Sequence, residues 1–157
     1  MNHSTKKGFS FGLTSGVITT LGLIVGLHSS TGSTLAVIGG IITIAIADAM
    51  SDALGIHISE ESEGQHTEKE IWEATIITFL TKFFFASLFI IPFLFFSLGG
   101  AIIAGIVWGL FLITVMSFSL AKKQGESYLK VISEHLAITI LVIIITHYVG
   151  DFVKNLA

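Results

Sequence analysis

The stretch Ile71–Ala121 reads IWEATIITFLTKFFFASLFIIPFLFFSLGGAIIAGIVWGLFLITVMSFSLA, and Glu73 and Lys82 are its only charged residues. A helix needs about 20 mainly apolar residues to cross the hydrocarbon core of a membrane. The stretch is more than twice that length, so it must cross the membrane and fold back. The turn is predicted near Ser97–Gly100, where small residues interrupt the apolar run.

The composition of the whole chain supports the same class of protein. Of its 157 residues, 52% are hydrophobic and 12% are charged, and the mean hydropathy is +0.87. Soluble domains carry about 25% charged residues, because their surfaces face water. The net charge of −3 argues against nucleic-acid binding. The absence of Cys excludes disulfides and thiolate metal sites.

We therefore expect an all-α integral membrane protein, folded as one membrane domain over residues 1–157. No small-residue cleavage site follows the first apolar run, which favours a retained helix over a removed signal peptide. Pro92 is expected to kink the third helix. Five stretches are predicted to cross the membrane: Phe9–Leu27, Ser33–His57, Ile71–Phe96, Leu98–Ala121 and Ile132–Val153.

The lysines predict the orientation, because cytoplasmic loops are enriched in Lys and Arg. With a cytoplasmic N-terminus, the C-terminus lies outside, where Lys154 is the exception to the rule. The expected outer loops, His28–Gly32 and Ser97–Gly100, carry no Lys. Six lysines would then lie on the cytoplasmic side: Lys6, Lys7, Lys69, Lys122, Lys123 and Lys130.

The second predicted span contains two aspartates, Asp48 and Asp52, in the run ITIAIADAMSDALGIHI. An ionised Asp at the centre of a membrane helix costs about 2.5–3.5 kcal/mol. The two residues lie four apart, so they share one helix face, which Gly55 and Ser59 continue. Neighbouring carboxylates repel, so one should hold a proton unless a cation lies between them. The pair predicts a cation or proton site, and the alternative is hydrogen-bonded packing residues.

The first predicted span carries a stripe of small residues. Spacing of four puts glycines on one helix face, where another backbone can come close. The stripe is typical of helix packing and also of a substrate pathway, and the sequence leaves both open. Its members are Gly8, Gly12, Gly16, Ser15 and Thr19. For Gly105 and Gly109 of the fourth span, ordinary helix packing is the favoured interpretation.

The connection Ile58–Glu70 reads ISEESEGQHTEKE, and no helix breaker separates it from the spans on either side. We expect the second and third helices to project into the cytoplasm as a short acidic hairpin. Clustered acidic residues either form a solvated cap or concentrate cations by electrostatic focusing. The candidates for cation capture are His57, Glu60, Glu61, Glu63, His66, Glu68 and Glu70.

Two further groups of polar residues lie inside the predicted spans. Lys82 is expected to extend its stem to the cytoplasmic interface, as long basic side chains do. His147 and Asp151 lie four apart near the outer end of the last span. They indicate either a solvated helix face or an exit site for a proton or metal.

Two stretches resemble a known family. TSGVITTLGLIVG (Thr14–Gly26) is similar to the first-span signature of the vacuolar iron transporter family, the plant and yeast iron and manganese carriers. IADAMSDALGIHISEESE (Ile46–Glu63) resembles the second-span signature, and the YVG of Tyr148–Gly150 also fits. The resemblance implies a dimer whose pathway is lined by the first two spans of each subunit. Family members move ferrous iron or manganese out of the cytosol in exchange for protons.

The chain departs from the family pattern at three positions. The family's first-span Asp is Ser15 here, a family Met falls on Asp52, and a family Glu falls on Ile56. The acidic cytoplasmic metal-binding domain that many members carry is reduced to the short hairpin. A carboxylate in place of a thioether favours oxygen-preferring cations such as Mn²⁺, Mg²⁺ or Ca²⁺.

From these features we expect a non-enzymatic, homodimeric, proton-coupled transporter that exports divalent metal, in a prokaryotic plasma membrane. The metal is the substrate, and no cofactor or nucleic acid is expected. Asp48 and Asp52 are the predicted ligands. The predicted pathway consists of Ser15, Thr19, Gly16 and Gly55. The alternatives are a carrier or channel of the same fold for other cations or protons, and a membrane assembly protein that transports nothing.

Overall fold

The computed structural model describes residues 3–156 and contains only helices over that range, with no β-strand. Five helical segments are long and apolar enough to cross a membrane, which confirms the predicted all-α membrane class and the number of spans. The third of these segments, Glu68–Phe95, consists of two helices. In chain order, the helices are α1 (His3–Thr31), α2 (Thr34–Glu63), α3 (Glu68–Leu88), α4 (Ile91–Phe95), α5 (Leu98–Gln124) and α6 (Tyr128–Lys154).

The helix ends follow local sequence signals. Ser33 caps α2 by accepting a hydrogen bond from the backbone N–H of Ala36 at 3.2 Å. Gly64 ends α2 in the left-handed conformation, with φ of 64°, which a glycine adopts without steric cost. Thr67 and Glu70 then form a capping box that starts α3. Pro92 lies in the first turn of α4, so the expected kink of the third span is a break between α3 and α4.

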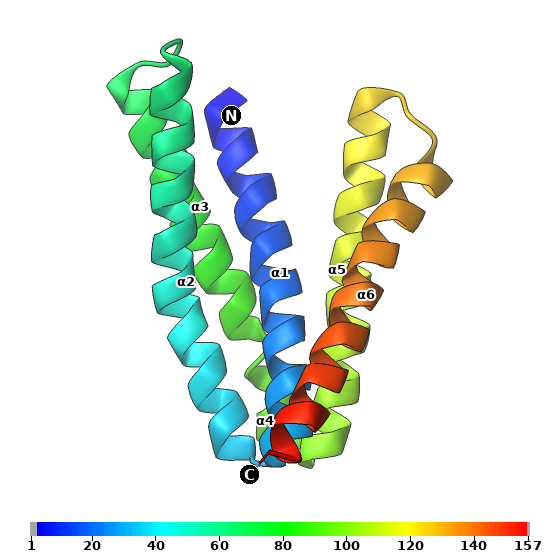
Figure 1. The fold of residues 1–157 in the computed structure, drawn as a ribbon. Helices are drawn as coiled ribbons and strands as arrows, with labels where there is room; N and C mark the ends of the chain where they lie inside the picture. Colours follow the sequence, from blue (N-terminus) through cyan, green and yellow to red (C-terminus); the bar gives the residue numbers. More distant parts are fainter. Residues whose placement is uncertain (1–2, 157) are drawn as a thin grey trace.

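The helices form two groups that meet at one end and spread apart at the other (Figure 1). One group holds α1, α2 and α3, and the other holds α5 and α6. The N-terminus, the α2–α3 turn and the α5–α6 turn all lie at the spread end, which we call the lysine-rich end. This arrangement gathers there the six lysines expected on one side of the membrane: Lys6, Lys7, Lys69, Lys122, Lys123 and Lys130.

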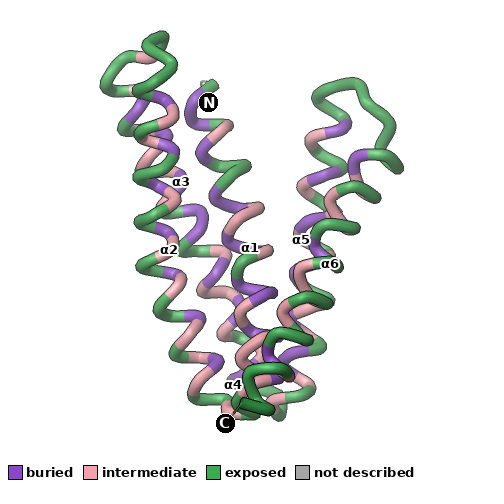
Figure 2. The backbone as a smooth tube through the Cα atoms, viewed as in Figure 1, coloured by how far each residue is buried: buried purple, intermediate pink, exposed green. Residues whose placement is uncertain are grey.

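Helix α1 is central, because it contacts α2, α3, α5 and α6. Its buried residues alternate with exposed ones in the first half and with partly buried ones from Thr20 to Ser30 (Figure 2). The apolar core gathers around Val17, Leu21 and Ile24 of α1, with Phe89 and Ile113 from the other helices. The helices α2, α3, α5 and α6 thus pack around α1.

The glycine stripe of α1 packs against α3 of the same chain. A Cβ atom at Gly8 would lie 2.6 Å from the carbonyl oxygen of Ala74, and one at Gly12 would lie 2.7 Å from that of Thr78. Such distances leave no room for a side chain. Of the two interpretations of this stripe, the structure supports helix packing, because α3 of the same chain covers Gly8 and Gly12.

The glycines of α5 also serve helix packing. A Cβ at Gly109 would lie 2.6 Å from Leu21, and one at Gly105 would lie 3.0 Å from Ile24. Both contacts join α5 to α1. The packing interpretation of these two glycines is confirmed.

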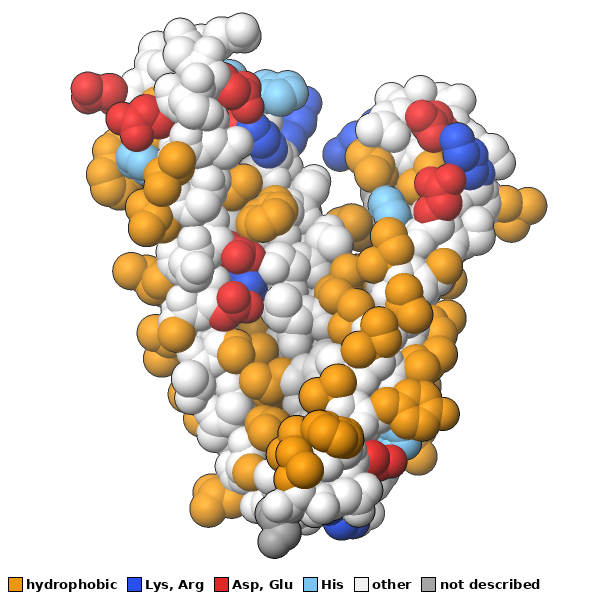
Figure 3. Space-filling model, viewed as in Figure 1, with side chains coloured by type: hydrophobic (Ala, Val, Ile, Leu, Met, Phe, Trp, Pro, Cys, Tyr) orange, Lys and Arg blue, Asp and Glu red, His pale blue; other side chains and the backbone are white. Residues whose placement is uncertain are grey.

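On the face shown in Figure 3, apolar side chains lie along most of the length of the helices, and most charged side chains gather toward the two ends. Large apolar side chains such as Leu35, Phe95 and Ile103 are between 66% and 82% exposed. An apolar exterior of this kind suits contact with lipid. One group of acidic and basic side chains interrupts it midway along α2 (Figure 3).

Candidate cation site

The charged group midway along α2 is an ion-paired cluster around Lys82 of α3. The Nζ atom of Lys82 lies 2.5 Å from Asp48 Oδ2 and 2.5 Å from Asp52 Oδ2. The Lys82 side chain is only 1% exposed. The expectation that Lys82 extends to the membrane interface is wrong. Two carboxylates of α2 supply its partners inside the helix group, so the ammonium has no need to reach water.

Ser15 of α1 completes the cluster. Lys82 Nζ donates a hydrogen bond to Ser15 Oγ at 2.9 Å, and Ser15 Oγ donates to Asp52 Oδ2 at 2.5 Å. Three helices thus contribute to one hydrogen-bonded group, which we call the Lys82 cluster: Ser15, Asp48, Asp52 and Lys82. The structure brings together both predicted ligands and one predicted pathway residue, and it adds the lysine.

Small residues let these helices come close enough to form the cluster. Gly16 lies against α3, where a Cβ would be 3.2 Å from the carbonyl oxygen of Lys82 and 3.3 Å from its Cγ. On α2, three buried alanines recur every four residues: Ala45, Ala49 and Ala53. Their small side chains allow close approach of neighbouring helices. The backbone of Gly16 therefore packs against the aliphatic stem of Lys82 and does not line an open channel.

The members of the cluster differ in their access to the outside. The side chain of Asp48 is 34% exposed and that of Asp52 is 19% exposed, whereas Lys82 is almost fully covered. The carboxylates therefore face outward, and the ammonium reaches them from inside the helix group. Two carboxylates and one ammonium leave the cluster with a formal charge of −1.

Two other predicted pathway residues lie outside the cluster. Thr19 is exposed, and its hydroxyl donates to the carbonyl oxygen of Ser15 in its own helix at 2.7 Å. Gly55 is exposed, and a Cβ there would meet nothing within 4 Å. Neither residue makes a hydrogen bond or an ion pair with the carboxylates of α2.

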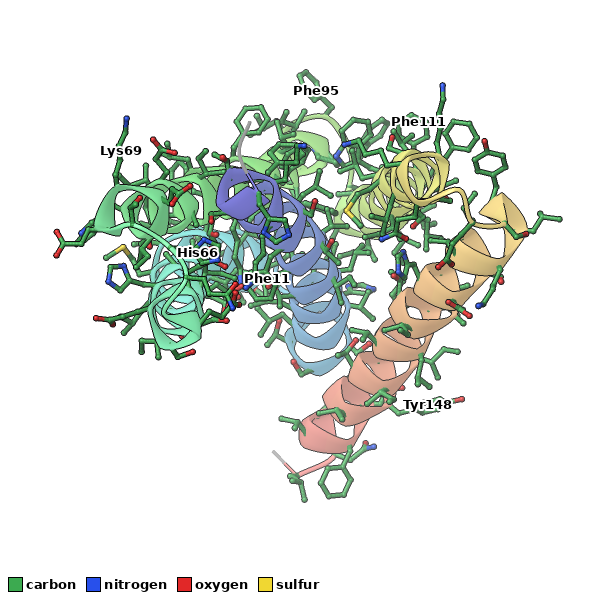
Figure 4. All side chains as sticks on the ribbon, turned by 90° about the horizontal axis from the view of Figure 1, so that it is seen from above. Phe11, His66, Lys69, Phe95, Phe111 and Tyr148 are labelled. Carbon is green, nitrogen blue, oxygen red and sulfur yellow. The ribbon has the colours of Figure 1, made fainter. Side chains whose placement is uncertain are left out.

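A second ion-paired group lies at the lysine-rich end. Lys7 of α1 contacts Glu60 Oε1 at 2.6 Å and Glu63 Oε1 at 2.7 Å. His66 Nε2 lies 3.3 Å from Glu63 Oε2, and Ser4 Oγ lies 3.4 Å from His66 Nδ1. We call this group the hairpin cluster. Figure 4 shows His66 beside the start of α1, seen along the molecule from the lysine-rich end.

The hairpin cluster contains possible metal ligands. One ligand atom from each of Glu60, Glu63 and His66 lies within 4.8 Å of the others. Glu60 is fully buried, whereas the Glu63 side chain is 41% exposed. A carboxylate and imidazole set of this kind suits transition metals. Of the seven residues predicted to capture cations, these three come together.

The other four have different surroundings. Glu70 accepts hydrogen bonds from Thr67 in the capping box, which gives it a structural role. Glu61 and Glu68 are exposed. His57 lies 3.0 Å from Thr75 Oγ1 and makes an edge contact with the ring of Trp72.

His57 and Trp72 belong to a groove of about 740 Å³ between α2 and α3. Its other lining residues are mainly apolar, and they include Met50 and Phe79. The aspartates of α2 do not line it. The groove is thus a mainly apolar part of the surface that is separate from the Lys82 cluster.

At the opposite end, His147 and Asp151 of α6 form the predicted pair. His147 Nε2 lies 3.5 Å from Asp151 Oδ2, and both side chains are about half exposed. His147 Nδ1 also lies 2.6 Å from the hydroxyl of Ser29 in α1. The pair therefore links α6 to α1, a contact that the spacing of the two residues did not indicate.

Comparison with known proteins finds no match: no family model fits the sequence, and no curated protein or solved structure is significantly similar to it. The resemblance to the vacuolar iron transporter family stays a prediction.

Proposed function

We propose that this protein is a proton-coupled secondary transporter that exports divalent metal cations, with Asp48 and Asp52 as ligands of the transported ion. The observation that carries the proposal is the convergence of both carboxylates on one cation, the ammonium of Lys82. Ionisable residues at membrane depth are costly and commonly mark ion pathways. The two carboxylates outnumber the ammonium, and the resulting formal charge of −1 favours a cation over an anion or an apolar substrate.

The donor atoms support a hard cation. Asp48, Asp52 and Ser15 offer only oxygen atoms, and the described residues of the cluster include no sulfur or imidazole ligand. Carboxylate and hydroxyl oxygens suit Mn²⁺, Mg²⁺ and Ca²⁺ better than softer metals. The resemblance of Ile46–Glu63 to a family of iron and manganese carriers supports the metal class.

In the proposed orientation, the lysine-rich end is cytoplasmic. Helix α2 has 30 residues and is therefore roughly 45 Å long, compared with about 30 Å for the hydrocarbon core. Its last turns, with Glu60 and Glu63, would then extend into the cytoplasm. A cation leaving the cytosol would meet the hairpin cluster before the Lys82 cluster, and His147 with Asp151 would lie on the exit side.

The exposure of the carboxylates favours a homodimer. Asp48 is one-third exposed on an otherwise apolar surface, where lipid cannot solvate a carboxylate. A second subunit over this face of α1 and α2 would enclose the carboxylates. The outward side of the cluster, and not the glycine stripe, is therefore our proposed subunit contact.

The test is Mn²⁺ flux into proteoliposomes, with and without a pH gradient. We expect the wild type to transport Mn²⁺ faster when protons can move in the opposite direction. The variant with both Asp48→Asn and Asp52→Asn should fall to the rate of empty liposomes. The matched control is Glu134→Gln, which also removes a carboxylate from a helix, at an exposed position of α6 outside both clusters. A double variant that transports normally would contradict the assignment.

A carrier of monovalent cations or protons is the second candidate. The cation that the carboxylates hold in this structure is a monovalent ammonium. The same proteoliposomes, loaded with a pH-sensitive dye and exposed to Na⁺ or K⁺ in place of Mn²⁺, distinguish the two. Proton movement driven by Na⁺ or K⁺ but not by Mn²⁺ would favour this second function.

A further inference from the structure

We propose that Lys82 is a tethered competitor of the transported cation: its ammonium occupies the position at which the cation binds, and binding displaces it. The inference rests on the proposed function in one respect, because it takes Asp48 and Asp52 as the cation site. It adds a residue that sets the affinity of this site for its substrate.

The first argument is the geometry around Nζ. Three oxygen atoms from two helices surround it, at 2.5 Å (Asp48), 2.5 Å (Asp52) and 2.9 Å (Ser15). Ca²⁺ binds oxygen ligands at about 2.3–2.6 Å, whereas Mg²⁺ requires about 2.0–2.1 Å. The ammonium therefore stands close to where a larger divalent ion would bind the same two carboxylates.

The second argument is that ammonium and metal cannot share the position. The same atom of each aspartate, Oδ2, contacts Lys82. A metal bound to both atoms would lie on Nζ or directly beside it. Two cations so close together repel strongly where water is scarce. Either the ammonium or the metal must therefore move away from the two Oδ2 atoms.

The third argument concerns direction of approach. The ammonium reaches the carboxylates from inside, because Lys82 is 1% exposed and its stem lies over Gly16. The aspartates are open on their outer side. A free cation therefore reaches the carboxylates from the side opposite Lys82, which in the proposed dimer lies between the two subunits. The cation and the ammonium then compete for one position from opposite sides.

Such competition lowers the apparent affinity, because only the fraction of molecules with a vacated site can bind. Removing the tethered cation should raise the affinity without adding any ligand. The probe is Mn²⁺, measured by calorimetry on the full-length protein in detergent. We expect Lys82→Met to bind Mn²⁺ at least tenfold more tightly than the wild type.

The matched control combines Lys82→Met with Asp48→Asn and Asp52→Asn. It also lacks the lysine, so any Mn²⁺ binding at the hairpin cluster is the same in both variants. The tenfold gain should disappear in this triple variant. An affinity of Lys82→Met equal to that of the wild type, or a gain that persists in the triple variant, overturns the proposal.

Lys82→Arg decides the matter if Lys82→Met does not fold. An Arg side chain keeps its positive charge at any accessible pH, and its planar head pairs with two oxygens at once. It should compete better than Lys, so Mn²⁺ affinity should fall at least tenfold. Wild-type affinity in Lys82→Arg overturns the proposal.

These outcomes are separate from those of the transport test. If the wild type shows no Mn²⁺ flux while Lys82→Met gains affinity, transport fails and the tethered competitor stands. If the wild type transports Mn²⁺ while Lys82→Met gains nothing, the competitor fails and transport stands.

Discussion

Helix α2 carries two pairs of carboxylates, and in each pair a lysine from another helix lies between them. In the Lys82 cluster, Asp48 and Asp52 hold a lysine that is 1% exposed. In the hairpin cluster, Glu60 and Glu63 hold Lys7, which is 32% exposed. The contacts have nearly the same lengths, so distance alone does not distinguish the pairs.

The difference lies in what surrounds each lysine. Ion pairs near water are screened and exchange readily with salt, so they contribute little to stability. In a covered ion pair, water and salt ions cannot replace a lost partner. Removing one partner therefore leaves a buried charge without compensation. The comparison teaches that the same arrangement has different costs in the two clusters. Loss of one partner should cost little at the lysine-rich end and much in the covered Lys82 cluster. Four predictions test it.

The largest effect is expected for Asp52→Asn. The amide keeps the volume of the carboxylate but removes its charge, so Mn²⁺ flux should be abolished while the protein still folds. Glu63→Gln is the matched change in the hairpin cluster and should leave maximal flux nearly intact. Proteoliposome flux and size-exclusion profiles check both variants. Equal losses in the two would erase the distinction between the clusters.

Removing Lys82 should be the next largest effect. Lys82→Met leaves Asp48 and Asp52 without their cation, at a cost of about 3 kcal/mol in the free energy of unfolding. Mn²⁺ should restore part of it, because a ligand that binds only the folded state stabilises that state. Thermal unfolding with and without Mn²⁺ measures this. A stability that Mn²⁺ leaves unchanged would contradict metal binding at the pair.

Asp52→Met sharpens the comparison of ligand types. It introduces the residue that the resembling family has at this position and replaces an oxygen donor with a thioether. Some flux should remain, and preference should move toward softer metals such as Fe²⁺. Competition between Fe²⁺ and Mn²⁺ in proteoliposomes provides the readout. An unchanged order of preference would show that this side chain does not touch the metal.

The smallest effect is expected for the acidic hairpin Ile58–Glu70 as a whole. Replacing Glu60, Glu61, Glu63, Glu68 and Glu70 with Gln should weaken apparent Mn²⁺ affinity a few-fold and leave maximal flux nearly the same. The effect should shrink at high ionic strength, because exposed charges are screened over about 10 Å at 0.1 M salt. Kinetics at two salt concentrations test it. A lower maximal flux with unchanged affinity would indicate gating in place of capture.

The fold could be predicted because membrane helices depend on long apolar runs that the sequence displays directly. The spans matched in number, and the aspartate pair was found because an i, i+4 spacing fixes two residues on one face. The observed α2 reaches Glu63 and not His57, because its charged last turns form a regular helix outside the apolar window used to define a span.

The position of Lys82 could not be predicted from its own helix. Its partners lie on α2 and α1, more than 25 residues away along the chain, and only the packing of three helices brings them together. One signal was available. A lysine and two aspartates at similar membrane depth each carry an unfavourable cost that pairing removes, which favours a contact among them. The pairing of Lys7 with Glu60 had no comparable signal, because both residues lie outside the predicted spans, where the sequence gives no reason to expect a buried charge.

At the end opposite the lysines, the backbones of the two helix groups approach closely, because a Cβ at Gly150 would be 2.5 Å from the carbonyl oxygen of Gly26. This contact could act as the pivot for a rotation of one helix group relative to the other. Helix α5 has 27 residues and is roughly 40 Å long, so a rotation of about 5° around that point would swing its far end by roughly 3–4 Å. All four side chains of the Lys82 cluster belong to the other helix group, which consists of α1, α2 and α3. Such a rotation would change the width of the spread end and leave the ammonium and its two carboxylates in contact.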